Sequence, residues 1–180
     1  MPDVDPRLEL FAEGLKSYPA AREAVKAFEE LVGGLARQVM LGHLEELREA
    51  SGQPNLSEDE LKVVENLVPP PAVGVGGWCR APETWGIIWG IKWTPPQSSG
   101  PTQLRAFAGV RVSAAYKRES VVSNLLSAAQ DAGSQAVEIE KASGWGHDVY
   151  VSVPMDPNIS IDETERLLDQ VVATCLGVVK

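Results

Sequence analysis

Few residues of this 180-residue chain combine the side-chain type and the spacing that catalysis requires. His147 and Asp148 are adjacent, and an imidazole beside a carboxylate can activate a nucleophile. No Gly-x-Ser-x-Gly elbow supplies that nucleophile. The second histidine, His43, stands beside Glu45 and Glu46 in a stretch with helical periodicity. The pattern therefore favours structural roles for both histidines.

Two carboxylates, Glu138 and Glu140, share one side of a predicted strand, and Lys141 follows them. Paired carboxylates can bind a metal ion or transfer protons. The nuclease pattern of an acid, one residue and a lysine would need an acid at position 139, where isoleucine stands. We therefore interpret this side of the strand as a solvated surface.

Cofactor and metal motifs are incomplete. Gly74-Val-Gly-Gly77 resembles part of a dinucleotide-binding loop, but the third glycine of that motif would fall at Cys79. No phosphate-binding Gly-x-x-x-x-Gly-Lys-Ser/Thr sequence occurs. Cys79 and Cys175 are too far apart to form a zinc-ligand pair, so we predict neither a metal nor a cofactor.

A binding surface is predicted on the strand at 104–114, where Arg105, Phe107 and Arg111 lie on one side around Gly109. Arginine beside an aromatic residue is common in protein interfaces. The alternative is that this side packs against an acidic helical segment. Trp145, between two glycines at a predicted hairpin tip, either contacts a partner or folds back onto the sheet, and the second is favoured.

The most distinctive segment is Trp85-Gly-Ile-Ile-Trp-Gly-Ile-Lys-Trp. On a strand, Trp85, Trp89 and Trp93 point to one side, since side chains alternate. These tryptophans either belong to the core or line a small-molecule pocket in which Arg105 or Arg111 holds an anionic group. Glycines on the opposite side place the strand in the middle of a sheet, which favours the core.

The first third of the chain reads as helical. Tyr18-Pro19 is expected to end a first helix, and Ser57 with Glu60 to form a capping box that starts a third. Gly33-Gly34, inside the second helix, is expected to mark a kink, a break or a close helix crossing. One apolar row within the second helix follows the spacing of a buried stripe: Val25, Phe28, Val32, Leu35 and Val39. The three predicted helices cover 6–17, 20–50 and 58–67.

The rest of the chain alternates as strands and two helices. Strands are predicted at 72–79, 85–93, 104–114, 136–141 and 147–153, and helices at 118–132 and from Ser160 to Gly177, with a capping box at Ser160 and Glu163. The order (β)ββαββα with hairpin-length links predicts an α+β fold, a largely antiparallel sheet and helices on one face. We divide the chain into a helical region, 1–68, and a sheet domain, 69–180.

Charge is uneven along the chain, whose net charge is −9. Residues 1–71 contain 14 acidic and 7 basic side chains, whereas residues 80–118 contain six basic side chains and one acidic. The overall sign argues against nucleic-acid binding. No apolar run reaches the ~18 residues of a membrane span. With no signal-peptide pattern and only two cysteines, we predict a cytoplasmic protein.

The order of elements over roughly 57–178 resembles the type III secretion chaperone-like fold. The segment from Leu125-Leu126 through Gly133, the hairpin at 136–153 and the closing helix from Ser160 carry the resemblance. It implies an acidic, cytoplasmic, dimeric protein that binds unfolded partner segments without catalysis. The helical lead of about fifty residues is additional to that fold.

The leading hypothesis is thus a non-enzymatic, homodimeric module that binds a protein segment along its sheet or in a groove. The alternative is a small-molecule-binding or enzymatic sheet domain with a tryptophan-lined pocket. A third hypothesis is an accessory domain that docks through its N-terminal helices.

Overall fold

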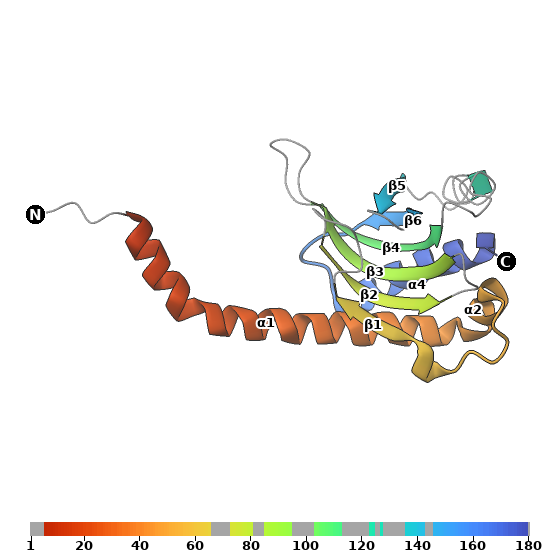
Figure 1. The fold of residues 1–180 in the computed structure, drawn as a ribbon, viewed down its shortest axis with the longest axis horizontal. Coiled ribbons are helices and arrows are strands. Elements are labelled where there is room, and N and C mark those ends of the chain that lie inside the picture. Colours follow the sequence, from red (N-terminus) through yellow and green to blue (C-terminus); the bar gives the residue numbers. More distant parts are fainter. Residues whose placement is uncertain are drawn as a thin grey trace, which may run out of the picture. The chain divides into compact units, whose positions relative to one another are not determined.

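The computed structural model describes residues 6–65, 73–80, 85–94, 103–112, 123–124, 127, 136–142 and 146–179. Only the backbone is described for residues 6–12, 62–65, 73, 80, 85, 94, 112, 136–142, 146–148 and 179. The chain divides into two compact units, Met1–Leu31 and Val32–Lys180, and each is considered by itself. The fold class is α+β with an antiparallel sheet, as the sequence predicts (Figure 1).

Helix α1, Pro6–Gly42, continues through both positions where an interruption was predicted. The prediction that a helix ends at Tyr18-Pro19 is wrong, because Pro19 lies inside α1. An interior proline removes one backbone hydrogen bond. The alanines, arginine and glutamate that follow it are strong helix formers and keep the chain helical. Gly33-Gly34 does not break the helix either.

The predicted helix at 20–50 ends instead at His43, where the backbone leaves the helical region with φ −112° and ψ 23°. Helix α2, Leu44–Ser51, follows. It ends at Gly52, whose φ of 64° is left-handed and therefore suits glycine. The Gly52 N–H donates to the carbonyl of Glu49 at 3.1 Å, so a carbonyl in the last turn of α2 has a hydrogen-bond partner.

The predicted third helix, 58–67, is wrong. Ser57 donates its backbone N–H to Glu60 Oε2 at 2.8 Å, but only a single 3-10 turn, η1, Glu58–Glu60, follows. Strand β1, Lys62–Glu65, comes next. Its two adjacent valines are β-branched and favour a strand, and β1 pairs with the next strand of the sheet.

Six strands form one sheet in the order β1-β2-β3-β4-β6-β5, and every neighbouring pair is antiparallel. The strands after β1 lie close to the predicted ranges: β2 Val73–Arg80, β3 Trp85–Thr94, β4 Gln103–Val112, β5 Ala136–Ala142 and β6 Gly146–Pro154. The tryptophan strand β3 has two strands on its β1 side and three on its β5 side, so its predicted central position is confirmed.

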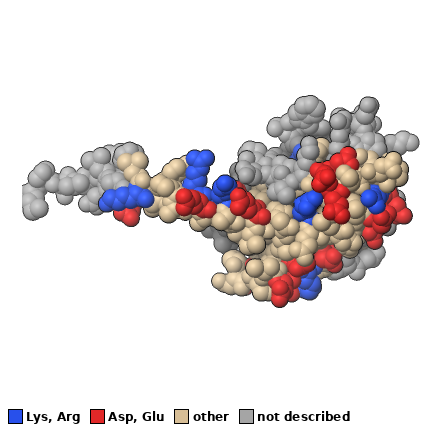
Figure 2. Space-filling view, turned by 90° about the horizontal axis from the view of Figure 1, so that it is seen from below, with Lys and Arg blue, Asp and Glu red and all other residues tan. Residues whose placement is uncertain are grey.

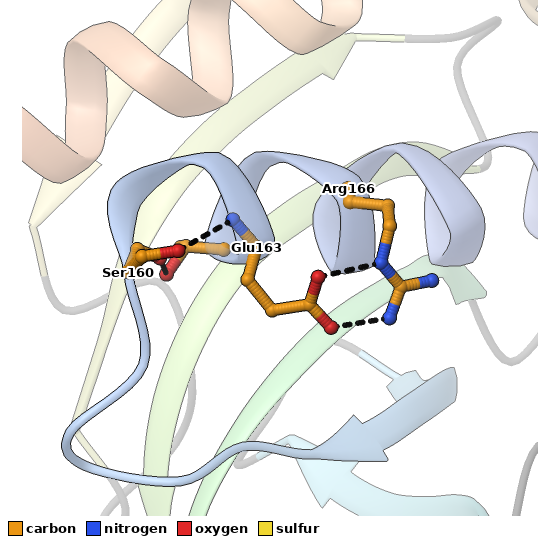
Figure 3. A network of polar contacts seen from close by, with 4 residues as sticks. Ser160, Glu163 and Arg166 are labelled. Atoms are coloured by element: carbon orange, nitrogen blue, oxygen red, sulfur yellow. Dashed lines mark hydrogen bonds and ion pairs between the residues drawn. The ribbon is translucent and has the colours of Figure 1, made fainter.

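Helix α4, Ile161–Val179, closes the fold and runs two residues beyond the predicted end at Gly177. Ser160 Oγ accepts the N–H of Glu163 at 3.2 Å, which caps the first turn (Figure 3). The carboxylate of Glu163 binds Arg166 rather than completing the predicted capping box. The predicted helix at 118–132 lies almost wholly outside the described residues, of which Ser123, Asn124 and Ser127 are helical.

The main core lies between one face of the sheet and the helices of the second unit. Helix α4 packs against β3, β4 and β6, and α2 packs against α4 (Figure 1). The indole of Trp89 is fully buried, and its Nε1–H donates to the carbonyl of Ala36 at 2.9 Å. This bond fixes the C-terminal part of α1 to the centre of the sheet, and it satisfies a buried donor.

At one register pair, the backbones of β2 and β3 lie too close together for either residue to carry a side chain. Gly76 and Gly90 are register partners. A Cβ built on Gly90 would lie 2.2 Å from the carbonyl oxygen of Val75, and one built on Gly76 would lie 1.9 Å from that of Trp89. Gly90 also has φ +152°, a conformation that favours glycine. The glycine-rich stretch thus serves close strand packing.

Candidate binding surfaces

The tryptophan residues divide between core and boundary. Trp89 is fully buried in the main core, and Trp93 is partly buried against it. The indole of Trp89 lies over Gly77, where an added Cβ would come within 2.1 Å of the ring. The side chain of Trp85 lies outside the described residues. Trp89 is therefore a packing residue with its single polar atom already bonded.

The opposite face of the sheet contains a second, smaller cluster. Ile88, Phe107 and Tyr150 are fully buried there, and Trp78 packs against them. The rings of Phe107 and Tyr150 meet edge to face with centroids 5.3 Å apart. Phe107, a predicted partner-binding residue, is thus inside the protein rather than at its surface.

The predicted binding arginines also lie on this second face. Arg105 is 8% exposed, and its Nε–H donates to Ser152 Oγ at 3.0 Å. Arg111 is partly buried. Of the three predicted residues on β4, Arg111 has the greatest access to solvent among the described side chains. Trp145, the fourth predicted contact residue, lies outside the described residues.

Sequence reasoning missed Lys92. This lysine is fully buried and is the register partner of Arg105. Its Nζ lies 4.4 Å from the centroid of the Tyr150 ring and 5.9 Å from that of Phe107, so two aromatic rings face the cation. The signal was present in the sequence, since position 92 shares a strand side with Gly90 and Ile88 on a strand predicted to be central in the sheet.

The candidate catalytic residues do not come together as a unit. Asp148 is the register partner of both Arg111 and Glu140, whereas His147 pairs with Val112 and Lys141. Neighbouring positions on a strand alternate between faces, so His147 and Asp148 occupy opposite faces. Asp148 and Glu140 instead share one register row with Arg111 across the sheet.

A shallow groove of about 410 Å³ lies between the C-terminal end of α1 and the N-terminal half of α4. Two of its carboxylates, those of Asp169 and Glu165, bind residues across it. Asp169 Oδ1 lies 2.8 Å from His43 Nε2, and Gln38 Nε2 donates to Glu165 at 3.4 Å. At its rim the Glu163–Arg166 pair lowers the pKa of Glu163 through hydrogen bonds (Figure 3). The groove is thus a surface between two helices whose polar side chains bind one another across it.

Other reactive groups are few in the described part of the chain. Cys79 and Cys175 are buried free thiols, and burial raises their pKa values to about 11 and about 12. Among the described residues, no three or more histidine, cysteine or acidic side chains gather as a metal site. None of the described helices has the length and apolar character needed to cross a membrane.

Five of the six exposed large apolar side chains among the described residues lie in the first unit, on the N-terminal part of α1, and the sixth is Ile161 at the start of α4. Leu15, Tyr18, Val25, Phe28 and Leu31 are between 42% and 64% exposed. The predicted buried row is thus wrong for two of its five residues: Val25 and Phe28 are exposed, whereas Val32 and Val39 are in the core and Leu35 packs against it. Charged residues of both signs are interleaved with uncharged ones along this segment (Figure 2).

We call Leu15, Tyr18, Val25 and Phe28 the N-terminal stripe. Their spacing of three and seven residues puts them on one side of the helix, with Ala21 between Tyr18 and Val25. Arg22 and Glu29 place charges among the apolar residues on this side of the helix, and these charges were the sequence signal that the side is exposed.

Comparison of the chain with family models, with curated proteins and with solved structures found no match.

Proposed function

We propose that the protein is a non-enzymatic, cytoplasmic binding module, and that the N-terminal stripe is its protein-docking surface. The observation that carries this proposal is the exposure of Leu15 at 62%, Tyr18 at 64% and Val25 at 54% on one helical segment. Single exposed apolar residues need no explanation, but a row of them on one helix is typical of a binding site.

The size of this surface supports the proposal. If the full area of such a residue is roughly 150–200 Å², the four residues of the stripe leave about 400 Å² accessible. The largest apolar patch on an ordinary monomer is about 300–600 Å² and is often functional. The stripe is therefore as large as the largest apolar patch of an ordinary monomer.

Helix stability points the same way. Residues 6–31 form the helical part of a unit separate from the sheet. This segment contains Gly14 and Pro19, which lower helix stability relative to alanine by about 1 and about 3 kcal/mol. Most of the stability of helices in proteins comes from packing of an apolar face rather than from intrinsic propensity. A docked partner would supply that packing.

The resemblance to secretion chaperones suggested a partner bound along the sheet. We favour the helix because Phe107 on the second sheet face is buried and the described groove is polar. The proposal retains a protein partner, no nucleic acid, no membrane and no cofactor. Its cytoplasmic location is supported by two buried free thiols, which suit a reducing compartment.

The docking proposal is tested with a matched pair of variants. Val25→Glu places a charge in the stripe, whereas Ala27→Glu places the same charge two residues away, on another side of the helix. The native chain, immobilised through its C-terminus, is challenged with host extract, and bound proteins are quantified. We expect binding to be lost in Val25→Glu and kept in Ala27→Glu. Host-protein binding that Val25→Glu retains in full would contradict docking through the stripe.

A further inference from the structure

We propose that the partner of the N-terminal stripe is the same stripe of a second copy, paired antiparallel. This inference rests on the proposed function and names its partner. It starts from the seven-residue repeat of the helix. Leu15, Arg22 and Glu29 occupy one repeated position, and Tyr18 and Val25 occupy the other. Such spacing is the pattern through which two helices pair.

The polar residues of the repeat select the direction of pairing. In a parallel, in-register pair, Arg22 would face Arg22 and Glu29 would face Glu29 of the second copy. Like-charge contacts at an interface are strongly unfavourable. An antiparallel pair avoids both contacts, because each residue then faces a different one.

One antiparallel register matches the side chains best. It places Leu15 opposite Val25 of the second copy and Tyr18 opposite Arg22, and two-fold symmetry repeats both contacts. The Arg22 guanidinium then stacks on a tyrosine ring, which is a favourable cation–π contact. Ala21 lies near the symmetry axis, where a small residue lets two helices approach closely.

The area is sufficient for a weak, specific dimer. The four residues of the stripe expose roughly 400 Å² per copy if each has a full area of roughly 150–200 Å². Ala21 and the methylene groups of Arg22 add to this area. Two copies together then bury about 1,000 Å², the lower limit for a specific interface. We therefore expect a reversible dimer with a dissociation constant in the micromolar range.

Engineered disulfides test the direction and register. Leu15→Cys combined with Val25→Cys should give a covalent dimer on mild oxidation, whereas Leu15→Cys alone should not. The two native thiols are buried and do not interfere. Cross-linking by the single variant would mean parallel pairing and would overturn the proposal. Absence of cross-linking in the double variant would overturn the register.

Sedimentation velocity of the unmodified full chain tests self-association itself. We expect the mass to rise toward twice 19.4 kDa as concentration increases. Val25→Glu should weaken the dimer at least about 100-fold, and Ala27→Glu should leave it unchanged. A native chain that stays monomeric at about 100 µM would overturn self-pairing. If Val25→Glu nevertheless lost binding of host proteins, the stripe would still be a docking surface, and only the proposal that it pairs with itself would fail.

Discussion

Val25 and Val32 lie two turns apart on α1, yet Val25 is 54% exposed whereas Val32 is 4% exposed. The two residues have the same side chain and the same place in the seven-residue repeat. Only Val32 is covered by the core of the second unit. Helix α1 thus has a valine at the same repeat position twice: Val32 is packed in the core, and Val25 is accessible to solvent.

This contrast predicts different effects of the same substitution. Val32→Ala should lower the free energy of unfolding by about 1–3 kcal/mol at any protein concentration, because it removes buried methyl groups. Val25→Ala should have little effect in dilute solution and a growing effect as concentration rises. Urea unfolding at two concentrations measures both. An equal, concentration-independent loss in the two variants would show that Val25 is packed within its own chain.

The glycines provide a second pair of opposite predictions. A Cβ at Gly34 meets no heavy atom within 4 Å, and Gly34 lies within α1. Gly34→Ala should therefore stabilise the protein by about 0.5–1 kcal/mol, or roughly 1–4 °C in melting temperature.

Gly76→Ala should instead destabilise the protein severely, because its Cβ would meet the Trp89 carbonyl oxygen at 1.9 Å. Differential scanning calorimetry compares the two variants. Normal stability of Gly76→Ala would mean that β2 and β3 lie further apart than described.

The Trp89 indole gives a third prediction. Trp89→Phe removes the donor to the Ala36 carbonyl and leaves a cavity beside Gly77. We expect a loss of about 2–4 kcal/mol from the hydrogen bond and the lost volume together. The intrinsic fluorescence should also lose its most buried contribution. Stability unchanged from the native chain would contradict the fixation of α1 on the sheet.

The two thiols give a fourth prediction. Because burial raises the pKa values of Cys79 and Cys175 to about 11 and about 12, both remain protonated at pH 8. The thiolate is the reactive form, so neither should react with a thiol-specific chromogenic reagent at that pH. In denaturant both should react at once. Rapid labelling of the native protein would show that one thiol is accessible.

The sheet was the part most open to prediction. Alternation along β3, β4 and β6 predicted these strands, because side chains on a strand alternate between two faces, and the glycines of β3 predicted its central place in the sheet. The hairpin-length links predicted antiparallel pairing, and all neighbouring strands pair in that way. These features are local, so one sequence suffices to find them.

The errors have identifiable physical causes. Local rules predicted a helix end at Pro19, but the strong helix formers that follow it keep the chain helical. Local rules also predicted a helix after Ser57, but two adjacent valines with a partner strand form β1 instead. The burial of Lys92 depends on Tyr150, which is distant in sequence. Periodicity likewise shows that a helix has an apolar side, but it cannot show whether anything covers that side. That is why Val25 and Phe28 were placed in the core.

Hydrogen exchange over residues 13–31 tests the central claim, docking of the N-terminal stripe against a second copy, most directly. An unpaired helix with Gly14 and Pro19 should exchange rapidly, whereas a paired one should be protected. We predict protection that increases with protein concentration in the native chain and in Ala27→Glu and is absent in Val25→Glu. Exchange over 13–31 that is equally fast in all three proteins at every concentration would contradict the account.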